Sequence, residues 1–265
     1  MTEALRQIFA ERGVEYAEAI PFSEAKILVP RKIDQLSFVP QSVILFAIPY
    51  YAGEMRERNL SRYAVAKDYH LFFRTFSDEV KCELQRLYPE AMFSAFADNS
   101  PIDEREAAAK AGLGILGMHS LLITEKYGSY VFLGEFLTNL PYQKIGTLTS
   151  FAVKECERCG ACLAACPKKE ICLSALTQKK GDLTREEEDQ ILSHGSVWGC
   201  DVCQEVCPHS QTAEITPIDY FKEDLIAHLT VEALENMNEN EFSRRAYSWR
   251  GKKTILRNLL LLKKS

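Results

Sequence analysis

Two short stretches decide the fold of the second half of the chain: CERCGACLAACPKKEIC at residues 156–172 and WGCDVCQEVCP at residues 198–208. Eight of the nine cysteines in the 265-residue chain lie within them, and each stretch contains a Cys-Pro pair. Thiols stay reduced in the cytosol, where clustered cysteines are more often metal ligands than disulfides. We therefore predict that these sulfur atoms hold an inorganic cofactor.

The spacing of the first four cysteines is C-x2-C-x2-C-x3-C-P, which is typical of bacterial 4Fe–4S domains. In such runs three cysteines bind one cluster and the fourth binds a second cluster. The second stretch supplies three cysteines, and Cys172 is the natural replacement for the missing one. The pattern thus predicts two clusters, one on Cys156, Cys159, Cys162 and Cys207, the other on Cys166, Cys172, Cys200 and Cys203.

The alternative is a pair of structural zinc sites, each held by four thiolates. Zinc sites usually use separated C-x2–4-C pairs, and a triple at x2, x2 with Cys-Pro endings does not suit them. The sequence therefore favours iron–sulfur clusters. The ninth cysteine, Cys82, lies far from the others, and we interpret it as a partly buried thiol.

The bulk composition is that of an ordinary soluble globular protein, with 46% hydrophobic and 26% charged residues. No apolar run reaches the ~18 residues of a membrane helix, and the charged start is not a signal peptide. A cytoplasmic location without membrane contact follows as an expectation. The net charge of −5 argues against a general nucleic-acid binder. Residues 244–265 hold eight Lys or Arg and no acid, so a local footprint would lie there.

The order of elements predicts an α+β first domain over residues 1–150. We expect a buried strand over 42–51, a long helix from Ser61, a helix capped by Ser100, and a hairpin of 120–124 with 129–140. Residues 151–215 form a small cluster domain, with a helix capped by Thr184 and Glu187. Residues 216–265 are a helical tail, with helices over 218–237 and 252–262.

Two clusters alone would make an electron carrier, yet ~150 residues precede them. A carrier needs no such domain. The first domain should therefore hold whatever accepts the electrons.

Several motifs resemble the epoxyqueuosine reductase family, from about residue 42 to the end. Besides the cysteine stretches they are SRYAVAKDYH (61–70), ADNSP (97–101), AGLGILG (111–117), GSYVFLGE (128–135), CLSALTQ (172–178) and GKKTILRN (251–258). The resemblance implies a cobalamin-dependent, iron–sulfur oxidoreductase related in architecture to reductive dehalogenases. A nitroreductase-like domain would bind cobalamin, and a ferredoxin-like domain with two 4Fe–4S clusters would cover it. The family's reaction belongs to queuosine biosynthesis and tRNA processing: it removes the epoxide oxygen of epoxyqueuosine at the anticodon wobble position.

The resemblance also implies roles for individual residues. Asp98 matches the proton donor, because the alkoxide that leaves must be protonated by a carboxylic acid. Tyr69 and His70 match a pair near the substrate, and Arg105 matches a residue that meets tRNA phosphate. The positions that match the cobalamin site are Arg62, Leu122, Leu133 and Asp201. Each also has an ordinary interpretation, as a turn residue, an exposed helix residue or part of the core.

The implied partners are the tRNA anticodon stem-loop and a reduced ferredoxin or flavodoxin-type electron donor, with the chain expected to be a monomer. Three departures from the family matter. Residues 114–120 read GILGMHS where the family usually has G-x-x-G-K-N, so Met118 and His119 replace the Lys-Asn pair. The Cys166–Cys172 link is short, and many members continue into helical repeats. Two alternatives stay open: a cobalamin-dependent reductase of a small molecule, and a non-catalytic electron-transfer protein.

Overall fold

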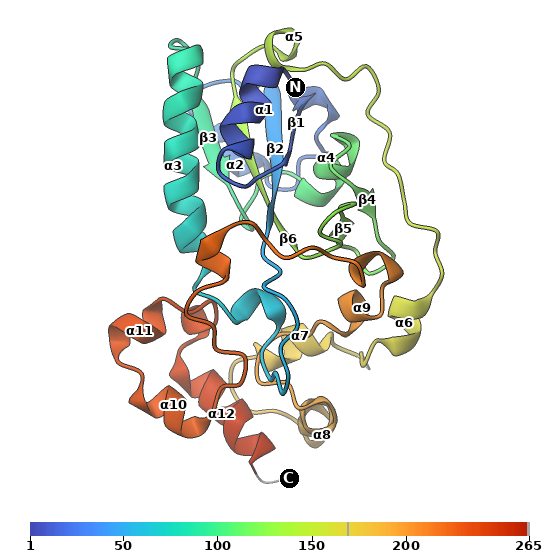
Figure 1. Cartoon of the computed structure of the whole chain (residues 1–265), viewed down its shortest axis with the longest axis vertical. Coiled ribbons are helices and arrows are strands. Elements are labelled where there is room, and N and C mark those ends of the chain that lie inside the picture. The colour runs from blue at the N-terminus through green and yellow to red at the C-terminus, as the bar shows by residue number, and fades with distance from the viewer. Residues whose placement is uncertain (169, 264–265) are drawn as a thin grey trace.

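The computed structural model describes residues 1–168 and 170–263. A four-stranded antiparallel sheet with the order β1-β2-β6-β3 forms one half of the molecule (Figure 1). Its strands are β1 (Tyr16–Pro21), β2 (Ser42–Pro49), β3 (Phe93–Phe96) and β6 (Val131–Thr138). All eight residues of β2 are buried, as expected for an apolar strand with neighbours on both sides. The strand predicted over 42–51 is therefore confirmed.

Helices cover both faces of this sheet. Helices α1 (Glu3–Ala10) and α3 (Tyr69–Leu87) lie on one face, where Phe9, Phe46 and Phe136 share an aromatic core. On the other face lie α4 (Glu104–Lys110) and a small hairpin of β4 (Ile115–Leu116) and β5 (Leu122–Ile123). Helix α2 (Pro30–Asp34) lies beside the same face, where Ile33 packs on its core. The mixed α/β architecture agrees with the predicted α+β class.

The long helix begins later than its sequence pattern predicts. Asp68 is its N-cap and accepts a hydrogen bond from the backbone N–H of His70 at 3.0 Å, so α3 starts at Tyr69 and not at Ser61. Arg62 and Ala64 belong to a separate 3-10 turn, Arg62–Ala64. Similarly, α4 starts at Glu104 because the carboxylate of Asp103, and not Ser100, caps it.

The predicted hairpin of 120–124 with 129–140 is wrong. Strand β5 pairs with β4, whereas β6 lies between β2 and β3. Both alternating side-chain sets of β6 are largely apolar, so the strand is stable only with neighbours and cover on both faces. A local hairpin would not have provided them.

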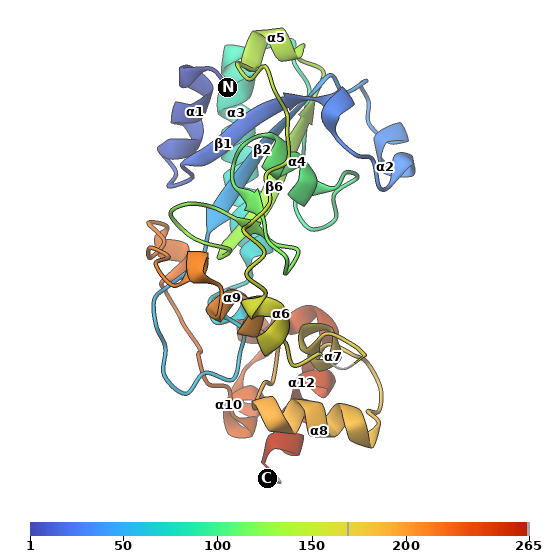
Figure 2. The same ribbon diagram turned by 90° about the vertical axis from the view of Figure 1, so that its right-hand side faces the viewer.

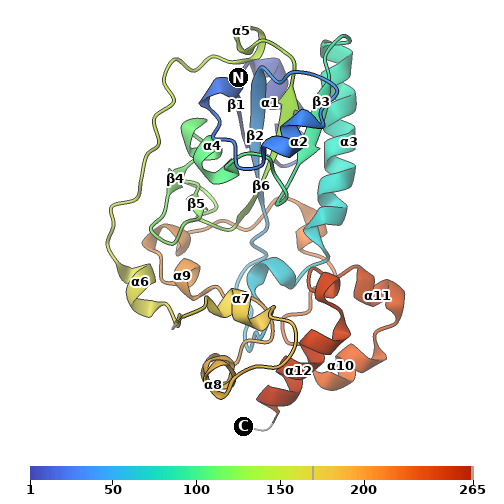
Figure 3. The ribbon, with the colours of Figure 1, turned by 180° about the vertical axis from the view of Figure 1, so that it is seen from behind.

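The second half of the chain is built from short helices. After α5 (Tyr142–Ile145), an extended segment runs along the edge of the molecule to α6 (Ala161–Ala165) (Figure 3). Helix α6 packs against α9 (Val202–Glu205), and α7 (Leu173–Thr177) packs against α8 (Arg185–His194). The predicted capping box of Thr184 and Glu187 is present at the start of α8.

The tail contains α10 (Val231–Asn236), α11 (Glu239–Ser243) and α12 (Lys252–Leu262). The helix predicted over 252–262 is confirmed. The helix predicted over 218–237 is wrong, because this range holds just α10 and a short 3-10 turn, Asp219–Phe221. Asp224 adopts a left-handed φ of 53°, which a continuous right-handed helix does not allow.

Two segments cross between the halves of the molecule (Figure 2). Leu60, Ala64 and Val65 pack in the core of the tail, beside Trp198. In return, Phe221 packs in the core under the sheet, and the N–H of Thr216 donates to the carbonyl of Tyr51 at 2.8 Å. The halves are thus interlocked. Among the described helices, none combines the length and apolar character needed to span a membrane.

Candidate functional site

A carboxyl cluster forms where β3 ends. Asp98 has a left-handed φ of 60°, a conformation that aspartate tolerates better than most residues. The hydroxyl of Tyr69 donates a hydrogen bond to Asp98 Oδ2, and His70 Nε2 lies 3.5 Å from the same oxygen. His70 Nδ1 in turn lies 2.8 Å from Asp68 Oδ1. The structure therefore brings together Asp98, Tyr69 and His70, as the sequence analysis predicts.

Aromatic stacking holds this cluster in place. The Tyr69 ring lies against His70, with centroids 4.1 Å apart, and against Phe132 of β6, with centroids 4.0 Å apart. Tyr69 is buried, so its hydroxyl has a fixed direction. The position of the Asp98 carboxyl is thus set by the packing of α3 on β6.

The environment raises the pKa of Asp98, first through burial and then through the neighbouring Asp68 carboxylate. The side chain is nevertheless 59% exposed, so solvent screens these effects and the group remains accessible to a reactant. A carboxyl that is both accessible and easier to protonate than usual suits a proton donor.

Two further carboxyl groups were missed by the sequence analysis. Glu135 of β6 is fully buried, and neither of its carboxyl oxygens has a hydrogen-bond partner within the described residues. The nearby Ser100 acts to lower the pKa of Glu135, but its effect is the smaller one. Burial, reinforced by Glu104, raises its pKa well above the usual range. Burial and then Asp98 raise the pKa of Glu104 to about 7. The signal was in the sequence: Glu135 interrupts the apolar face of Leu133 and Leu137.

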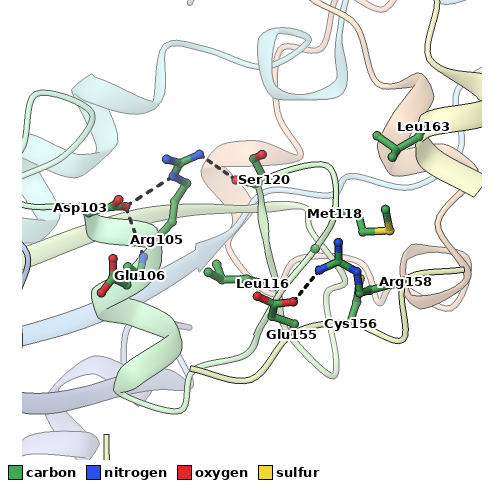
Figure 4. Close-up of a pocket in the computed structure, with 11 residues that line it drawn as sticks. Asp103, Arg105, Glu106, Leu116, Met118, Ser120, Glu155, Cys156, Arg158 and Leu163 are labelled. Atoms are coloured by element: carbon green, nitrogen blue, oxygen red, sulfur yellow. Dashed lines mark hydrogen bonds and ion pairs between the residues drawn. The ribbon is translucent and has the colours of Figure 1, made fainter. Parts of the chain in front are cut away.

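A cleft of about 460 Å³ lies beside α4 (Figure 4). Arg105 and Arg158 both line it, and each is held by a neighbour. Arg105 Nη1 donates to the carbonyl of Ser120 at 3.0 Å, and Arg158 Nη1 donates to Glu155 Oε2 at 3.0 Å. Figure 4 shows Arg105 reaching from α4 toward Ser120, with Arg158 and Cys156 on the side of the cleft that leads to α6. The cleft is also lined by Asp103, Glu106 and Glu155, so Arg105 lies at a cleft of mixed charge and is itself 3.7 Å from Asp103.

A smaller cavity adjoins the cleft and shares Met118, Cys156 and Arg158 with it. Its lining includes all four cysteines predicted for the first cluster, namely Cys156, Cys159, Cys162 and Cys207. The packing of α6 on α9 brings Cys207 to the first three. His119 also lines this cavity, and burial lowers its pKa.

The four cysteines predicted for the second cluster lie near one another as well. Burial raises the pKa of Cys200 to about 11, with Asp201, Cys172 and Cys166 adding to the shift. Burial raises the pKa of Cys203 to about 12, with Cys200, Cys166 and Cys172 contributing. Cys82, in contrast, is exposed on α3, so its interpretation as a partly buried thiol is wrong.

Within residues 1–168 and 170–263, no group of three or more His, Cys, Asp or Glu side chains is arranged to hold a single metal ion. The statement concerns sites in which several side chains bind one ion, as in a zinc site. In a 4Fe–4S cluster each cysteine binds a different iron, so the sulfur atoms need not converge on one point.

The residues predicted for cobalamin have varied surroundings. Asp201 is buried and accepts hydrogen bonds from Ser61 Oγ at 2.5 Å, from Arg58 Nη1 at 2.6 Å and from the backbone of Arg62 at 2.8 Å. Arg62 is buried over Tyr51 and pairs with Glu54 at 3.1 Å. Asp201 is therefore fully engaged within the chain, whereas Arg62 keeps a buried Nε–H without a partner among the described residues. Leu122 is buried in the core beside α4, and Leu133 is half-buried on β6.

Several basic side chains of residues 244–263 already have partners within the chain, so fewer are free to bind phosphate than the sequence suggests. Arg245 is buried and pairs with Asp224 at 2.9 Å, Lys252 donates to the carbonyl of Met237, and Arg257 donates to the carbonyl of Lys179 at 2.7 Å. In the described part of the tail, Arg244, Lys253 and Lys263 are exposed. Lys264 lies outside the described residues.

The fold and these groups define a mixed α/β protein that carries two four-cysteine groups and an accessible carboxyl group at Asp98. A family model described as epoxyqueuosine reductase QueG, DUF1730, matches residues 31–99. An epoxyqueuosine reductase of Gloeobacter violaceus is 30% identical over 81% of this chain and 73% of its own length. One of Listeria monocytogenes is 29% identical over 96% of this chain and 73% of its own length. Other curated relatives are matched over less, for example 54% of the protein from Aliivibrio fischeri.

Solved structures agree with the sequence matches. A crystal structure of an epoxyqueuosine reductase with an epoxyqueuosine-modified tRNA-Tyr stem loop has a TM-score of 0.79, with 25% identity over 98% of this chain and 80% of that one. The same values apply to a Bacillus subtilis enzyme whose aspartate-bearing catalytic loop is swung out of the active site. The chain belongs to the epoxyqueuosine reductase family, whose members are oxidoreductases.

Proposed function

We propose that this chain reduces epoxyqueuosine to queuosine in tRNA, using cobalamin and two 4Fe–4S clusters. The observation that carries the proposal is the arrangement of Asp98: it is held by Tyr69 and His70 in the region that matches the family model. The solved relative with a modified tRNA stem loop supports tRNA as the substrate.

The proposed reaction removes the epoxide oxygen as water. Two C–O bonds break, one C=C bond forms, and two electrons and two protons are consumed. Cobalamin, when bound, supplies a strongly reducing nucleophile for the carbon atom of the epoxide. The chain must then deliver electrons to the cofactor and a proton to the departing oxygen.

Asp98 is the proposed proton donor for that oxygen. The Tyr69 hydroxyl binds Asp98 Oδ2 and so leaves Oδ1 to carry the proton toward a substrate. His70 and Asp68 complete a chain of groups through which Asp98 can be reprotonated. The raised pKa of Asp98 keeps a larger fraction of the carboxyl protonated near neutral pH than an ordinary aspartate would have.

The carboxyl groups near Asp98 offer hydrogen-bond acceptors that would suit cobalamin. Glu104 and Glu135 carry buried oxygens without hydrogen-bond partners among the described residues. The peripheral amides of a corrin ring are donors of the kind these oxygens lack. We propose that residues 1–150 form a nitroreductase-like domain holding the corrinoid near Asp98 and Leu133. Arg62, Leu122 and Asp201 remain proposed contributors to the cobalamin site, with Arg62 and Asp201 also linking the segment before α3 to α9.

The two cysteine groups are the proposed ligands of the clusters, in a ferredoxin-like domain over residues 151–215. Four thiols line one cavity and the other four are electrostatic neighbours, in the combinations that the sequence spacing predicts. Because Cys156 also borders the cleft, the first cluster would be the one nearer the substrate side.

The proposed partners follow from the cleft and the clusters. Arg105 and Arg158 offer two guanidinium groups to the phosphates of an anticodon stem-loop, and the helical tail over 216–265 adds Arg244 and Lys253. A reduced ferredoxin or flavodoxin-type protein is the proposed electron donor, acting on the monomer in the cytoplasm.

Anaerobic reconstitution with iron, sulfide and cobalamin tests the cofactor part of this proposal. We expect two cubane signals and a cob(II)alamin signal by EPR spectroscopy. A protein that forms both clusters but binds no corrinoid would reject the reductase and leave an electron-transfer protein. The substrate part is tested by digesting tRNA from a strain that lacks the gene, where epoxyqueuosine should accumulate; normal queuosine would reject it.

A further inference from the structure

His119 has an unusual environment between β4 and β5. Its ring packs so closely on Gly117 that a Cβ atom at that position would lie 2.5 Å from Cε1. Its Nδ1 accepts a hydrogen bond from the backbone N–H of Leu121 at 3.2 Å. An imidazole nitrogen that accepts from an N–H carries no proton, so the neutral ring has its proton on Nε2. The backbone thus determines both the orientation and the tautomer of His119.

The Nε2–H group is buried and has no hydrogen-bond partner within the described residues. Leaving a buried donor without an acceptor destabilises the folded state, so native proteins rarely do it without a reason. His119 lines the cavity that also contains Cys156, Cys159, Cys162 and Cys207. The acceptors that this donor lacks are the kind that an iron–sulfur cluster would bring, namely sulfide and thiolate sulfur atoms.

We propose that His119 donates its Nε2–H to a sulfur atom of the cluster held by these four cysteines and thereby raises the reduction potential of that cluster. The inference rests on the proposed function, since it requires the cluster. A hydrogen bond to sulfur stabilises the reduced, more negative state more than the oxidised state, which shifts the potential upward. His119 is therefore a positioning residue that acts through the cluster.

The consequence concerns the direction of electron flow. Cys156 lines both this cavity and the cleft with Arg105, so the affected cluster is the one nearer the cleft. A donor that raises the potential of this cluster favours the movement of electrons onto it, and so toward the cleft. In this chain a histidine occupies a position where the family pattern has Asn, so the potential would be a property of this member.

The test is an EPR-monitored redox titration of the fully reconstituted protein, in which the second cluster serves as an internal reference. His119→Leu removes the donor, and we expect one cluster to titrate at a lower potential while the other is unchanged. His119→Gln keeps an N–H donor, and its potential should stay nearer that of the wild type. Unchanged potentials of both clusters in His119→Leu would overturn the proposal.

A second measurement does not depend on any variant. In wild-type protein labelled with [15N]histidine, pulsed EPR of the reduced cluster should detect a weak coupling to one imidazole nitrogen across the hydrogen bond. Formation of both clusters without such a coupling would reject the role of His119 and leave the proposed function intact. Failure of the wild type to form any cubane cluster would reject both.

Discussion

Asp98 joins a strained backbone to an accessible carboxyl group. A left-handed φ at a residue other than glycine costs free energy that the surrounding structure must supply, and here Tyr69 and His70 supply contacts to the side chain. The sequence pattern around Asp98 alone would equally suit a turn before a helix cap. What distinguishes it is the approach of α3, which is 29 positions away in sequence at Tyr69 and could not be inferred from local pattern.

We predict that Asp98→Asn lowers the rate of epoxide reduction by about 10²- to 10⁴-fold, because general acid catalysis contributes about that much. The amide has nearly the same shape but cannot donate a comparable proton. The measurement is single-turnover conversion of a modified stem-loop, followed by mass spectrometry. Asp78→Asn, at an exposed position of α3, is the matched control. Wild-type rates in Asp98→Asn would remove Asp98 from the chemistry.

Glu135 gives a prediction about stability and pH. Its pKa is raised in the folded protein, so the folded state holds a proton that the unfolded state releases. The stability contributed by wild-type Glu135 therefore falls as pH rises above the unfolded pKa, and Glu135→Gln removes this dependence. The melting temperature of the variant relative to wild type should rise between pH 5 and pH 8.

The control for that experiment is Glu90→Gln, at an exposed position after α3. Its melting temperature relative to wild type should not change with pH. A difference between Glu135→Gln and wild type that is independent of pH would mean that Glu135 is ionised in the folded protein.

At the scale of elements, short-range patterns were the most informative. The capping box at α8 and the cysteine spacing each depend on residues within a few positions, and both led to the observed arrangement. The pairing of β6 with β2 and β3 depends on strands distant in sequence, so a local pattern wrongly favours the nearest strand as its partner. The contact between α6 and α9 is compatible with the predicted first cluster, whose ligands come from both stretches.

The cluster assignment makes a pairwise prediction. Cys207→Ser and Cys159→Ser should abolish the same cluster signal, although they lie in different stretches. Cys166→Ser should instead match Cys200→Ser, although Cys166 is close to Cys162 in sequence. Each variant should retain about half of the roughly eight iron atoms of two cubanes. Iron content and EPR spectra test this prediction. If Cys159→Ser and Cys166→Ser instead abolished the same cluster signal, the crossed assignment would be wrong.

At the scale of the whole molecule, the two halves are joined by crossing segments and by buried charge. Arg58 lies on the segment that crosses from the sheet to the half of the molecule with the cysteines. It pairs with Asp201, whose side chain is 1% exposed, and with Glu205 of α9. The pair therefore ties the cysteine-bearing helix to the segment before α3. The order of elements and the cysteine segment predict a large first domain and a small second one. The crossing of residues 59–65 and 216–221 depends on packing between distant segments, which local sequence patterns do not encode.

We predict that Arg58→Met destabilises the protein by roughly 3 kcal/mol, because breaking a buried pair leaves a charge without its partner. Asp201 keeps its bonds to Ser61 and Arg62, which places the effect at the low end of the usual range. Chemical denaturation of the reconstituted protein measures it. Arg86→Met breaks an exposed pair with Glu83 and should cost less than about 1 kcal/mol. Equal effects of the two substitutions would mean that the Arg58 pair is not a structural link.

The central claim is that Asp98, cobalamin and the two clusters together reduce epoxyqueuosine in tRNA. The most direct measurement is an anaerobic single turnover with fully reconstituted, chemically reduced protein and a stem-loop carrying epoxyqueuosine. We predict that queuosine forms with the loss of one oxygen atom. The reduced cofactors should lose two electrons for each molecule of queuosine formed, measured from their EPR and absorption signals. Stem-loop that stays unmodified while clusters and cobalt are fully reduced would contradict the claim.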